Sequence, residues 1–152
     1  MEPFDIDKTV QDAIENMRLV VPEVNIQYAG ATGSLVNGDE LQVVQVVNNL
    51  LSNAIKYSPN SKNVEVHIHK VANFVKICVR DYGMGISYQD KLKIFERFFR
   101  VRQIQKKFPG LGIGLYVSHE IVVNHGGTLW VDSELGEGAT FSFTLPILKT
   151  HK

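Results

Sequence analysis

Residues 49–57 read Asn-Leu-Leu-Ser-Asn-Ala-Ile-Lys-Tyr, a stretch with polar side chains at helical spacing. At about 100° per residue, Asn49, Asn53 and Lys56 lie on one side of a helix and the apolar residues on the other. The polar side takes in three more residues, Gln42, Gln45 and Ser52. Solvated helix surfaces usually carry Glu, Lys and Arg rather than repeated amides, but the helix alone leaves both alternatives open, a pocket wall and a solvated surface.

Amides and a lysine on one side of a helix suit a particular chemistry. An amide oxygen can ligate a hard cation such as Mg2+, and a nearby lysine can contact the phosphates that the cation carries. If the polar side is a pocket wall, the pocket is suited to a phosphate-bearing ligand.

The composition of the chain limits its class. Its 152 residues are a typical length for one domain with one core, and 16 Lys and Arg balance 16 Asp and Glu, so no bulk charge attracts nucleic acid or anionic lipid. No apolar run approaches the about 18 residues that span a bilayer, and the start does not resemble a signal peptide. We expect one soluble, cytoplasmic domain over residues 1–152 that contacts neither nucleic acid nor membrane. Whether the full-length protein is anchored in a membrane is left open.

Hydrophobic periodicity predicts the order of the elements. Helices are expected over residues 7–20, 39–57, 88–99 and 115–124, and a loop over residues 101–109. Strands are expected over residues 24–28, 34–36, 64–71, 74–79, 129–131 and 140–145. Asp7 or Thr9 is expected to cap the first helix and Asp39 the second. Cys78, the only cysteine, lies in an apolar strand, which indicates a buried thiol.

The first of two glycine clusters follows a strand, where Asp81 is followed by Gly83 and Gly85. A simple Asx turn explains this pattern, and the pattern alone favours that explanation. The alternative is a buried carboxylate that accepts a hydrogen bond from an exocyclic amine.

The second glycine cluster, Gly110, Gly112 and Gly114, immediately precedes a predicted helix. Free backbone amides at a helix start can bind phosphate. The cluster is not a Walker loop, because no Gly-Lys-Ser or Gly-Lys-Thr follows.

Taken in order, these motifs resemble the catalytic and ATP-binding domain of sensor histidine kinases, in the ATPase superfamily shared with gyrase, the heat-shock chaperone and mismatch-repair proteins. The similarity runs from about residue 4 to residue 147. The five boxes of the family correspond to residues 49–57, 81–85, 95–100, 110–115 and 136–140. The resemblance implies an α+β fold, a two-layer α/β sandwich in which a mixed β-sheet lies under three main helices, with a flexible ATP lid over about residues 86–109.

The resemblance also implies roles for residues of the first two boxes. Asn53 would ligate Mg2+, with Asn49 and Lys56 contacting the metal shell and the phosphates. Tyr57 would pack near the nucleotide. Asp81 would accept a hydrogen bond from the adenine amino group and so select ATP over GTP, and glycines would let the base approach, namely Gly83 and Gly85.

For the remaining boxes, the resemblance implies contacts with the phosphates and closure of the lid. Arg100 would reach the terminal phosphate, with Lys106 or Lys107 assisting. The glycine-led segment would bind nucleotide through Gly110, Leu111, Gly112, Ile113, Gly114 and Leu115, and the last box through Thr140. Leu111 departs from the pattern, since many members have threonine there. The phenylalanines of the third box are expected to pack against protein rather than nucleotide.

The residue at position 49 indicates which kind of side chain accepts the phosphoryl group. Hydrolytic relatives, and the stand-alone serine kinases that regulate sigma factors, usually place a glutamate base four residues before the metal-binding asparagine, where this chain has Asn49. An amide cannot take a proton from water or from a serine hydroxyl, whereas a neutral imidazole already carries a nucleophilic lone pair. We therefore expect a histidine acceptor and very slow ATP hydrolysis.

The phosphoacceptor histidine is not found in this chain. His119 is followed by Glu120, but no proline lies five residues after the histidine, and the segment belongs to a predicted helix. We expect a catalytic module without its dimerisation and phosphoacceptor helices. Its partners would be a histidine-bearing helical hairpin of the same kinase and, downstream, a response regulator. Two alternatives are a stand-alone serine kinase of the sigma-regulating type, which Asn49 disfavours, and a nucleotide-binding sensor or pseudokinase without transfer activity.

Overall fold

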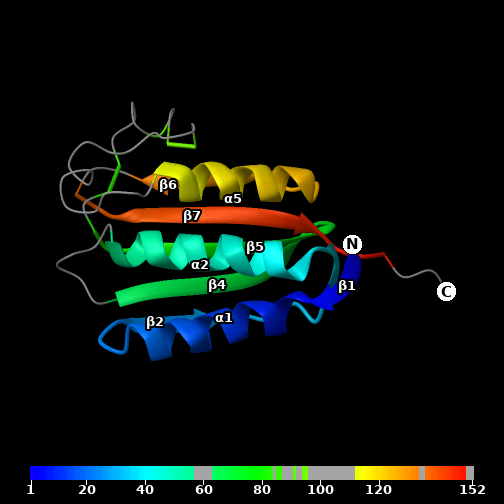
Figure 1. The fold of residues 1–152 in the computed structure, drawn as a ribbon, viewed down its shortest axis with the longest axis horizontal. Helices are drawn as coiled ribbons and strands as arrows, with labels where there is room; N and C mark the ends of the chain where they lie inside the picture. Colours follow the sequence, from blue (N-terminus) through cyan, green and yellow to red (C-terminus); the bar gives the residue numbers. More distant parts are fainter. Residues whose placement is uncertain are drawn as a thin grey trace.

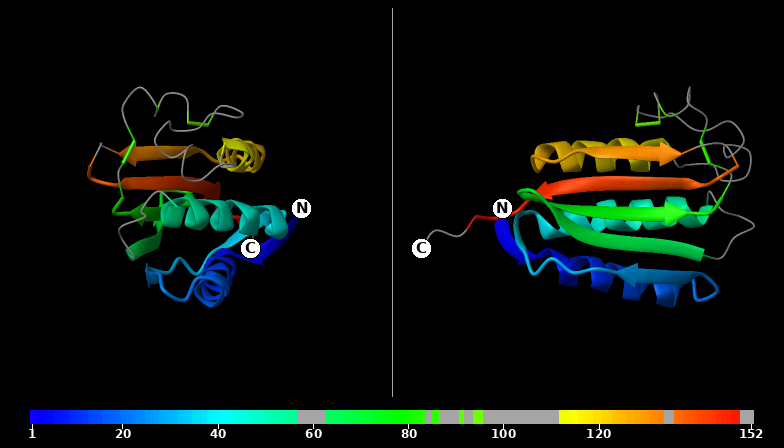
Figure 2. Two further views of the ribbon diagram at one scale, coloured as in Figure 1. Left: turned by 60° about the vertical axis from the view of Figure 1, so that its left-hand side comes forward. Right: turned by 180° about the vertical axis from the view of Figure 1, so that it is seen from behind.

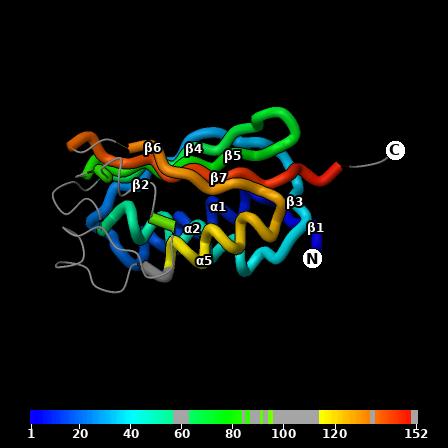
Figure 3. The backbone as a smooth tube through the Cα atoms, turned by 90° about the horizontal axis from the view of Figure 1, so that it is seen from above, coloured from blue at the N-terminus to red at the C-terminus, as the bar shows by residue number. Residues whose placement is uncertain are grey.

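Three helices lie on one face of a five-stranded sheet in the computed structural model of the chain (Figure 1). The structure describes residues 1–56, 63–83, 85–86, 91, 94–95, 112–133 and 136–149. The helices are α1 (Ile6–Val20), α2 (Glu40–Lys56) and α5 (Gly112–Asn124). Figure 3 shows the helices as one layer and the sheet as the other, and both views of Figure 2 keep this arrangement.

The sheet is mixed, as expected. Its strands, in spatial order, are β2 (Asn25–Ala29), β4 (Asn63–Val71), β5 (Phe74–Asp81), β7 (Ala139–Pro146) and β6 (Leu129–Ser133). The pair of β2 and β4 is parallel, and the other three pairs are antiparallel. A separate two-stranded sheet pairs β1 (Glu2–Asp5) with β3 (Leu35–Gly38). The sequence did not predict β1, because Glu-Pro-Phe-Asp has one apolar side chain apart from the proline and shows no alternation.

Side chains along each strand point alternately to the face of the sheet that the helices cover and to the opposite, open face. In β5 the side chains of Val75, Ile77 and Val79 are buried under the helices, and Asp81 continues that face to the end of the strand. The alternate residues point to the open face, where Cys78 is half-buried rather than buried as expected. No helix among the described residues covers this open face.

The predicted helices over residues 7–20, 39–57 and 115–124 are confirmed as α1, α2 and α5. Ile94 and Phe95, in the predicted helix over 88–99, lie in a turn. Asp39 caps α2, since its Oδ1 accepts a hydrogen bond from the backbone N–H of Gln42 at 3.3 Å. The start of α5 is Gly112, three residues before the expected one. The predicted loop at 101–109, and the predicted helix at 88–99 except Lys91, Ile94 and Phe95, lie outside the described residues. No helix in the described part of the chain is long and apolar enough to cross a membrane.

The start of α2 and the end of α5 lie at the end of the molecule where the N-terminus lies, on the right in Figure 1, and His125 joins the two helices. The backbone N–H of Asp39 donates to His125 Nε2 at 3.0 Å, and His125 Nδ1 donates to the carbonyl of Ile121 at 2.8 Å. A side chain on Gly38 has no room, because its Cβ would lie 2.4 Å from the imidazole. This contact fixes the start of α2 against the end of α5.

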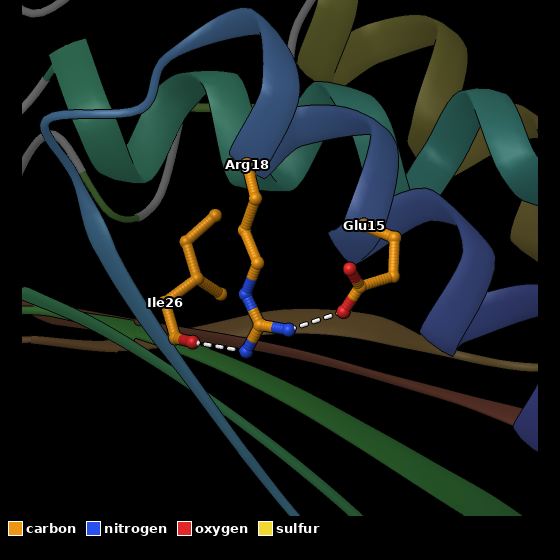
Figure 4. Close-up of polar contacts among 3 residues, drawn as sticks. All are labelled: Glu15, Arg18 and Ile26. Carbon is orange, nitrogen blue, oxygen red and sulfur yellow. Dashed lines mark hydrogen bonds and ion pairs between the residues drawn. The ribbon is translucent and has the colours of Figure 1, made fainter.

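Arg18 connects helix α1 to the edge strand β2 (Figure 4). Its Nη2 donates to the carbonyl of Ile26 at 2.6 Å, and its Nη1 forms an ion pair with Glu15. The guanidinium therefore connects the last turn of α1 with the sheet.

The N-terminal cap of α1 is Asp5, not Asp7 or Thr9 as expected, since Asp5 Oδ1 accepts from the backbone N–H of Lys8 at 3.2 Å. Asp7 instead accepts hydrogen bonds from the loop before β3. Its Oδ1 accepts from the Thr32 hydroxyl at 2.7 Å, and its Oδ2 accepts from the backbone N–H groups of Thr32 at 2.9 Å and Gly33 at 2.8 Å. Burial acts to raise the pKa of Asp7, but these hydrogen bonds outweigh it and lower the pKa below the usual value of 3.8.

Asp7→Asn should lower the free energy of unfolding at pH 7 by about 1–3 kcal/mol, because one acceptor is replaced by a donor that faces backbone N–H groups. The pKa of Asp7 is lower folded than unfolded, so its ionised form stabilises the fold fully above about pH 4, and this contribution is lost as the pH falls through the folded pKa. Urea unfolding at pH 7 and pH 3 should show the difference between wild type and variant shrinking at the lower pH. The matched control is Asp12→Asn, an exposed carboxylate on the same helix. A difference that is the same at both pH values would contradict this account.

Candidate functional site

Four elements meet at the end of the molecule opposite His125, on the left in Figure 1. They are the last turns of α2, the end of β5, the start of α5 and the start of β7. Helix α2 packs against both α5 and β5. The residues that the sequence singled out on α2, at Asp81 and around Gly112 are therefore brought to one end of the fold.

The polar side of α2 changes from exposed to buried along the helix. Gln42 and Gln45 are exposed, Asn49 and Ser52 are half-buried, and Asn53 is only 3 % exposed. The start of this polar side is therefore exposed to solvent, its middle part from Asn49 to Asn53 lies partly or fully in the interior, and Lys56 at the end is exposed again.

Asn53 is buried with an unsatisfied donor. Its Nδ2 has no hydrogen-bond partner among the residues that the structure describes. A buried amide without a partner costs about 1–3 kcal/mol, and a ligand that supplies an acceptor would offset this cost. A phosphate oxygen is such an acceptor, and the amide oxygen of the same side chain suits Mg2+. Asn53 therefore fits a magnesium–phosphate ligand.

Asn49, one turn before Asn53, connects α2 to α5. Its Nδ2 donates to the carbonyl of Gly114 at 3.3 Å and to the hydroxyl of Ser118 at 3.0 Å. Both amide hydrogens are used in this way, which leaves Oδ1 as the remaining polar atom of the side chain. Lys56, two turns after Asn49, is exposed.

Asp81 is fully buried at the end of β5. Its Oδ1 accepts hydrogen bonds from the backbone N–H of Gly83 at 2.9 Å and of Ala139 at 3.2 Å. The bond to Gly83 is the Asx turn that the pattern favoured, and the burial shows that the turn and an interior carboxylate occur together. Gly85, also buried, has a φ of +72°, which side-chain-bearing residues rarely adopt.

The last glycine box packs directly against Asp81. Gly138 has a φ of +85°, and a Cβ there would lie 2.3 Å from the backbone oxygen of Asp81. Ser133 completes this arrangement, since its hydroxyl accepts from the backbone N–H of Ile86 and donates to the carbonyl of Gly138, both at 2.7 Å. The Ser133 hydroxyl thus connects Ile86, which follows Asp81 in the chain, with Gly138, which packs against Asp81.

The start of α5 carries Gly112 and Gly114 in its first turn. The first amides of a helix have no partner within the helix and point out of its positive end. Leu115 is only 1 % exposed, so its side chain belongs to the core. Only the backbone of Leu115 could then contact a ligand.

Thr140 does not lie with Asp81. It pairs with Arg80 on β5 and Asp132 on β6, on the open face of the sheet, where these residues line a separate cavity of about 350 Å³ with Lys91, Ser133, Glu137, Gly138 and Ala139. Ala139, whose N–H bonds to Asp81, is the residue on the covered face. Thr140 and Asp81 therefore point to opposite faces of the sheet, and the contact of Thr140 with nucleotide stays a prediction.

Other predicted residues are not described. Tyr57, Arg100, Gly110, Leu111, Lys106 and Lys107 lie outside the described residues, as do the side chain of Ile113 and most of the predicted lid. Phe95 is described, and it packs on protein as expected, stacked on His119 at 5.5 Å between ring centroids and edge-on to Phe141 at 6.3 Å.

Three positions of this site were not singled out from the sequence, namely Ser118, Ser133 and Ala139. Ser118 bonds to a residue 69 positions away and Ala139 to one 58 positions away. Such pairs carry no local signal in a single sequence.

Comparison with known proteins agrees with this geometry. Residues 38–149 match the family described as histidine kinase-, DNA gyrase B-, and HSP90-like ATPase. The sensor-like histidine kinase SenX3 of Mycolicibacterium smegmatis is 34 % identical over 96 % of this chain and 39 % of its own length. The sensor histidine kinase WalK of Bacillus subtilis is 40 % identical over 71 % of this chain and 18 % of its own. The chain thus spans less than two-fifths of these relatives.

Solved structures show the same likeness. The mycobacterial sensor histidine kinase MprB has a TM-score of 0.86 and 28 % identity, and the match covers 98 % of this chain and 100 % of that chain. Full-length ShkA in complex with AMPPNP has a TM-score of 0.78 and 28 % identity over 99 % of this chain and 32 % of that chain. With a family match over most of its length and this fold, the chain belongs to the family of histidine kinase-, DNA gyrase B- and HSP90-like ATPases.

Proposed function

We propose that this chain is the catalytic domain of a sensor histidine kinase and transfers the γ-phosphate of Mg-ATP to a histidine on a separate dimerisation domain. One observation carries the proposal. A buried amide with no hydrogen-bond partner among the described residues, a buried carboxylate and a glycine-led helix start lie at one end of the fold. Each suits a different part of Mg-ATP.

The carboxylate of Asp81 would accept a hydrogen bond from the adenine amino group. Guanine has a carbonyl at the corresponding position, and two acceptors facing each other in a buried site repel, so ATP is selected. Gly83 and Gly85 leave room for the base beside this carboxylate.

The phosphates would lie between α2 and the start of α5. Asn53 Oδ1 would ligate Mg2+, which when bound neutralises part of the phosphate charge. Asn49 Oδ1 would accept from the water shell of the cation, and Lys56 would pair with phosphate. Backbone amides from Gly110 to Leu115 would bind phosphate at the helix start, and from outside the described residues we assign Tyr57 to the nucleotide and Arg100 to the terminal phosphate.

The acceptor would be a histidine. The position where a base would stand on α2 is Asn49, whose two amide hydrogens are already donated to α5. It can neither take a proton from a serine hydroxyl nor activate water. A neutral imidazole needs no such base for its lone pair to attack phosphorus.

The partners follow from this assignment. The first is a histidine-bearing helical hairpin of the same kinase, and the second is a response regulator that receives the phosphoryl group downstream. Since ATP is the donor, we place the domain in the cytoplasm.

The test is transfer in trans from labelled ATP. The chain is incubated with Mg2+ and separately produced histidine-bearing helical hairpins of sensor kinases, and the product is treated with acid. The expected product loses its label in acid, as phosphohistidine does, and Asn53→Ala abolishes its formation. An acid-stable product would indicate a serine kinase, and ATP binding without transfer to any hairpin would indicate a nucleotide sensor.

ATP hydrolysis by the chain alone serves as a second measurement in the same experiment. Without a base at position 49, turnover should lie far below about 1 per second, the lower end of the usual range for enzymes. Turnover at or above that rate would contradict the histidine assignment.

A further inference from the structure

Ser118 is a fully buried hydroxyl that no part of the proposed function uses so far. It lies in α5 four residues after Gly114, so the two residues occupy one face of the helix a turn apart. The carboxamide of Asn49 reaches this face from α2, 3.0 Å from Ser118 Oγ and 3.3 Å from the Gly114 carbonyl.

These two contacts determine which way the carboxamide faces. The Gly114 carbonyl can only accept, so the NH2 group of Asn49 must point toward α5 and Oδ1 must point away from that carbonyl. The terminal torsion of asparagine is otherwise broad. Ser118 provides the second acceptor and thereby uses the second amide hydrogen.

We propose that Ser118 is a positioning residue that holds the Asn49 carboxamide so that its oxygen faces the Mg-ATP site. Ser118 itself touches neither nucleotide nor metal. The inference rests on the proposed function, in which Asn49 Oδ1 accepts hydrogen bonds from the water shell of Mg2+. It makes the orientation of a side chain on α2 depend on a side chain of α5.

The first measurement needs no ligand. In the nucleotide-free chain, the side-chain NH2 resonances of Asn49 should shift in Ser118→Ala and exchange faster with water, because one of the two hydrogens has lost its acceptor. Ser142→Ala is the matched control, since Ser142 is also a buried serine, 1 % exposed, but lies in β7. Unchanged Asn49 resonances in Ser118→Ala would overturn the proposal.

The second measurement is the affinity for ATP with and without Mg2+. Ser118→Ala should weaken Mg-ATP binding about five-fold, the effect of one neutral hydrogen bond, and change metal-free ATP binding little. Ser142→Ala should bind Mg-ATP as the wild type does, and Ser118→Cys, which keeps a weak acceptor, should be intermediate.

A double-mutant cycle separates positioning from packing. If Ser118 acts through Asn49, then Asn49→Ala with Ser118→Ala should bind Mg-ATP no more weakly than Asn49→Ala alone. Additive losses would overturn the proposal, as would wild-type affinity of Ser118→Ala while Asn49→Ala binds weakly. If the wild-type chain binds no Mg-ATP at all, the proposed function fails and this inference fails with it.

Discussion

Asn53→Ala should weaken Mg-ATP binding by about 100-fold or more, the largest effect expected of any single change in α2. The substitution removes the proposed metal ligand and a buried donor that has no hydrogen-bond partner among the described residues, and losing contacts with charged groups costs about 1.5–3 kcal/mol each. Binding measured by calorimetry with excess Mg2+ should show this loss, and with a chelator present the two proteins should bind ATP with similar, weak affinity.

The free energy of unfolding of ligand-free Asn53→Ala should be equal to that of the wild type or higher. Removing a buried amide donor that no described residue satisfies should relieve a cost in the ligand-free protein. The matched control is Asn48→Ala, the neighbouring half-buried amide on α2 outside the polar side. Equal Mg-ATP affinity of Asn53→Ala and wild type would remove Asn53 from the metal site.

Asp81→Asn should lower ATP affinity by about 100-fold and reduce the preference for ATP over GTP. The carboxylate oxygen that accepts from adenine is replaced in part by an NH2 group, which cannot accept and which can donate to the guanine carbonyl. Competition of ATP and GTP against a fluorescent nucleotide gives both affinities for wild type and variant.

The control for this prediction must separate binding from folding. Asp81 Oδ1 also accepts from the N–H groups of Gly83 and Ala139, and asparagine retains one oxygen for that purpose. Thermal unfolding should therefore show a cooperative transition in the variant. Asp132→Asn, an exposed carboxylate on β6, should bind ATP as the wild type does. An Asp81→Asn protein that folds and keeps its ATP affinity would show that this carboxylate does not contact the base.

The sequence predicted α2 and the glycine segments well because their signals are local. The amides of α2 repeat at helical spacing, the first glycine cluster directly follows a strand, and the second marks the start of α5, which begins at Gly112. The strand order and the pairing of β1 with β3 depend on contacts between distant segments and could not be obtained in this way. The sequence did not indicate Asp5 as the cap, because Asp7 is an equally suitable residue. Asp7 instead accepts hydrogen bonds from a loop that is distant in the sequence, and Asp5 caps the helix.

For Cys78, which is half-buried rather than buried, and for the face on which Thr140 lies, the signal was present in the sequence. Phe141, Phe143 and Leu145 alternate with polar residues in β7, so Thr140 belongs to the polar, open face. The same alternation in β5 places Cys78 on that face. Ser118, in contrast, gives no signal at all, since only the packing of α5 on α2 brings it to Asn49.

The location of the nucleotide is the central claim, and backbone amide NMR of the chain titrated with Mg-ATP tests it most directly. We predict that the largest shifts fall in the second half of α2, at residues 81–86 and in the first turns of α5, at the left end of Figure 1. Shifts confined to Asp132, Glu137 and their neighbours around the 350 Å³ cavity of the open face would contradict it.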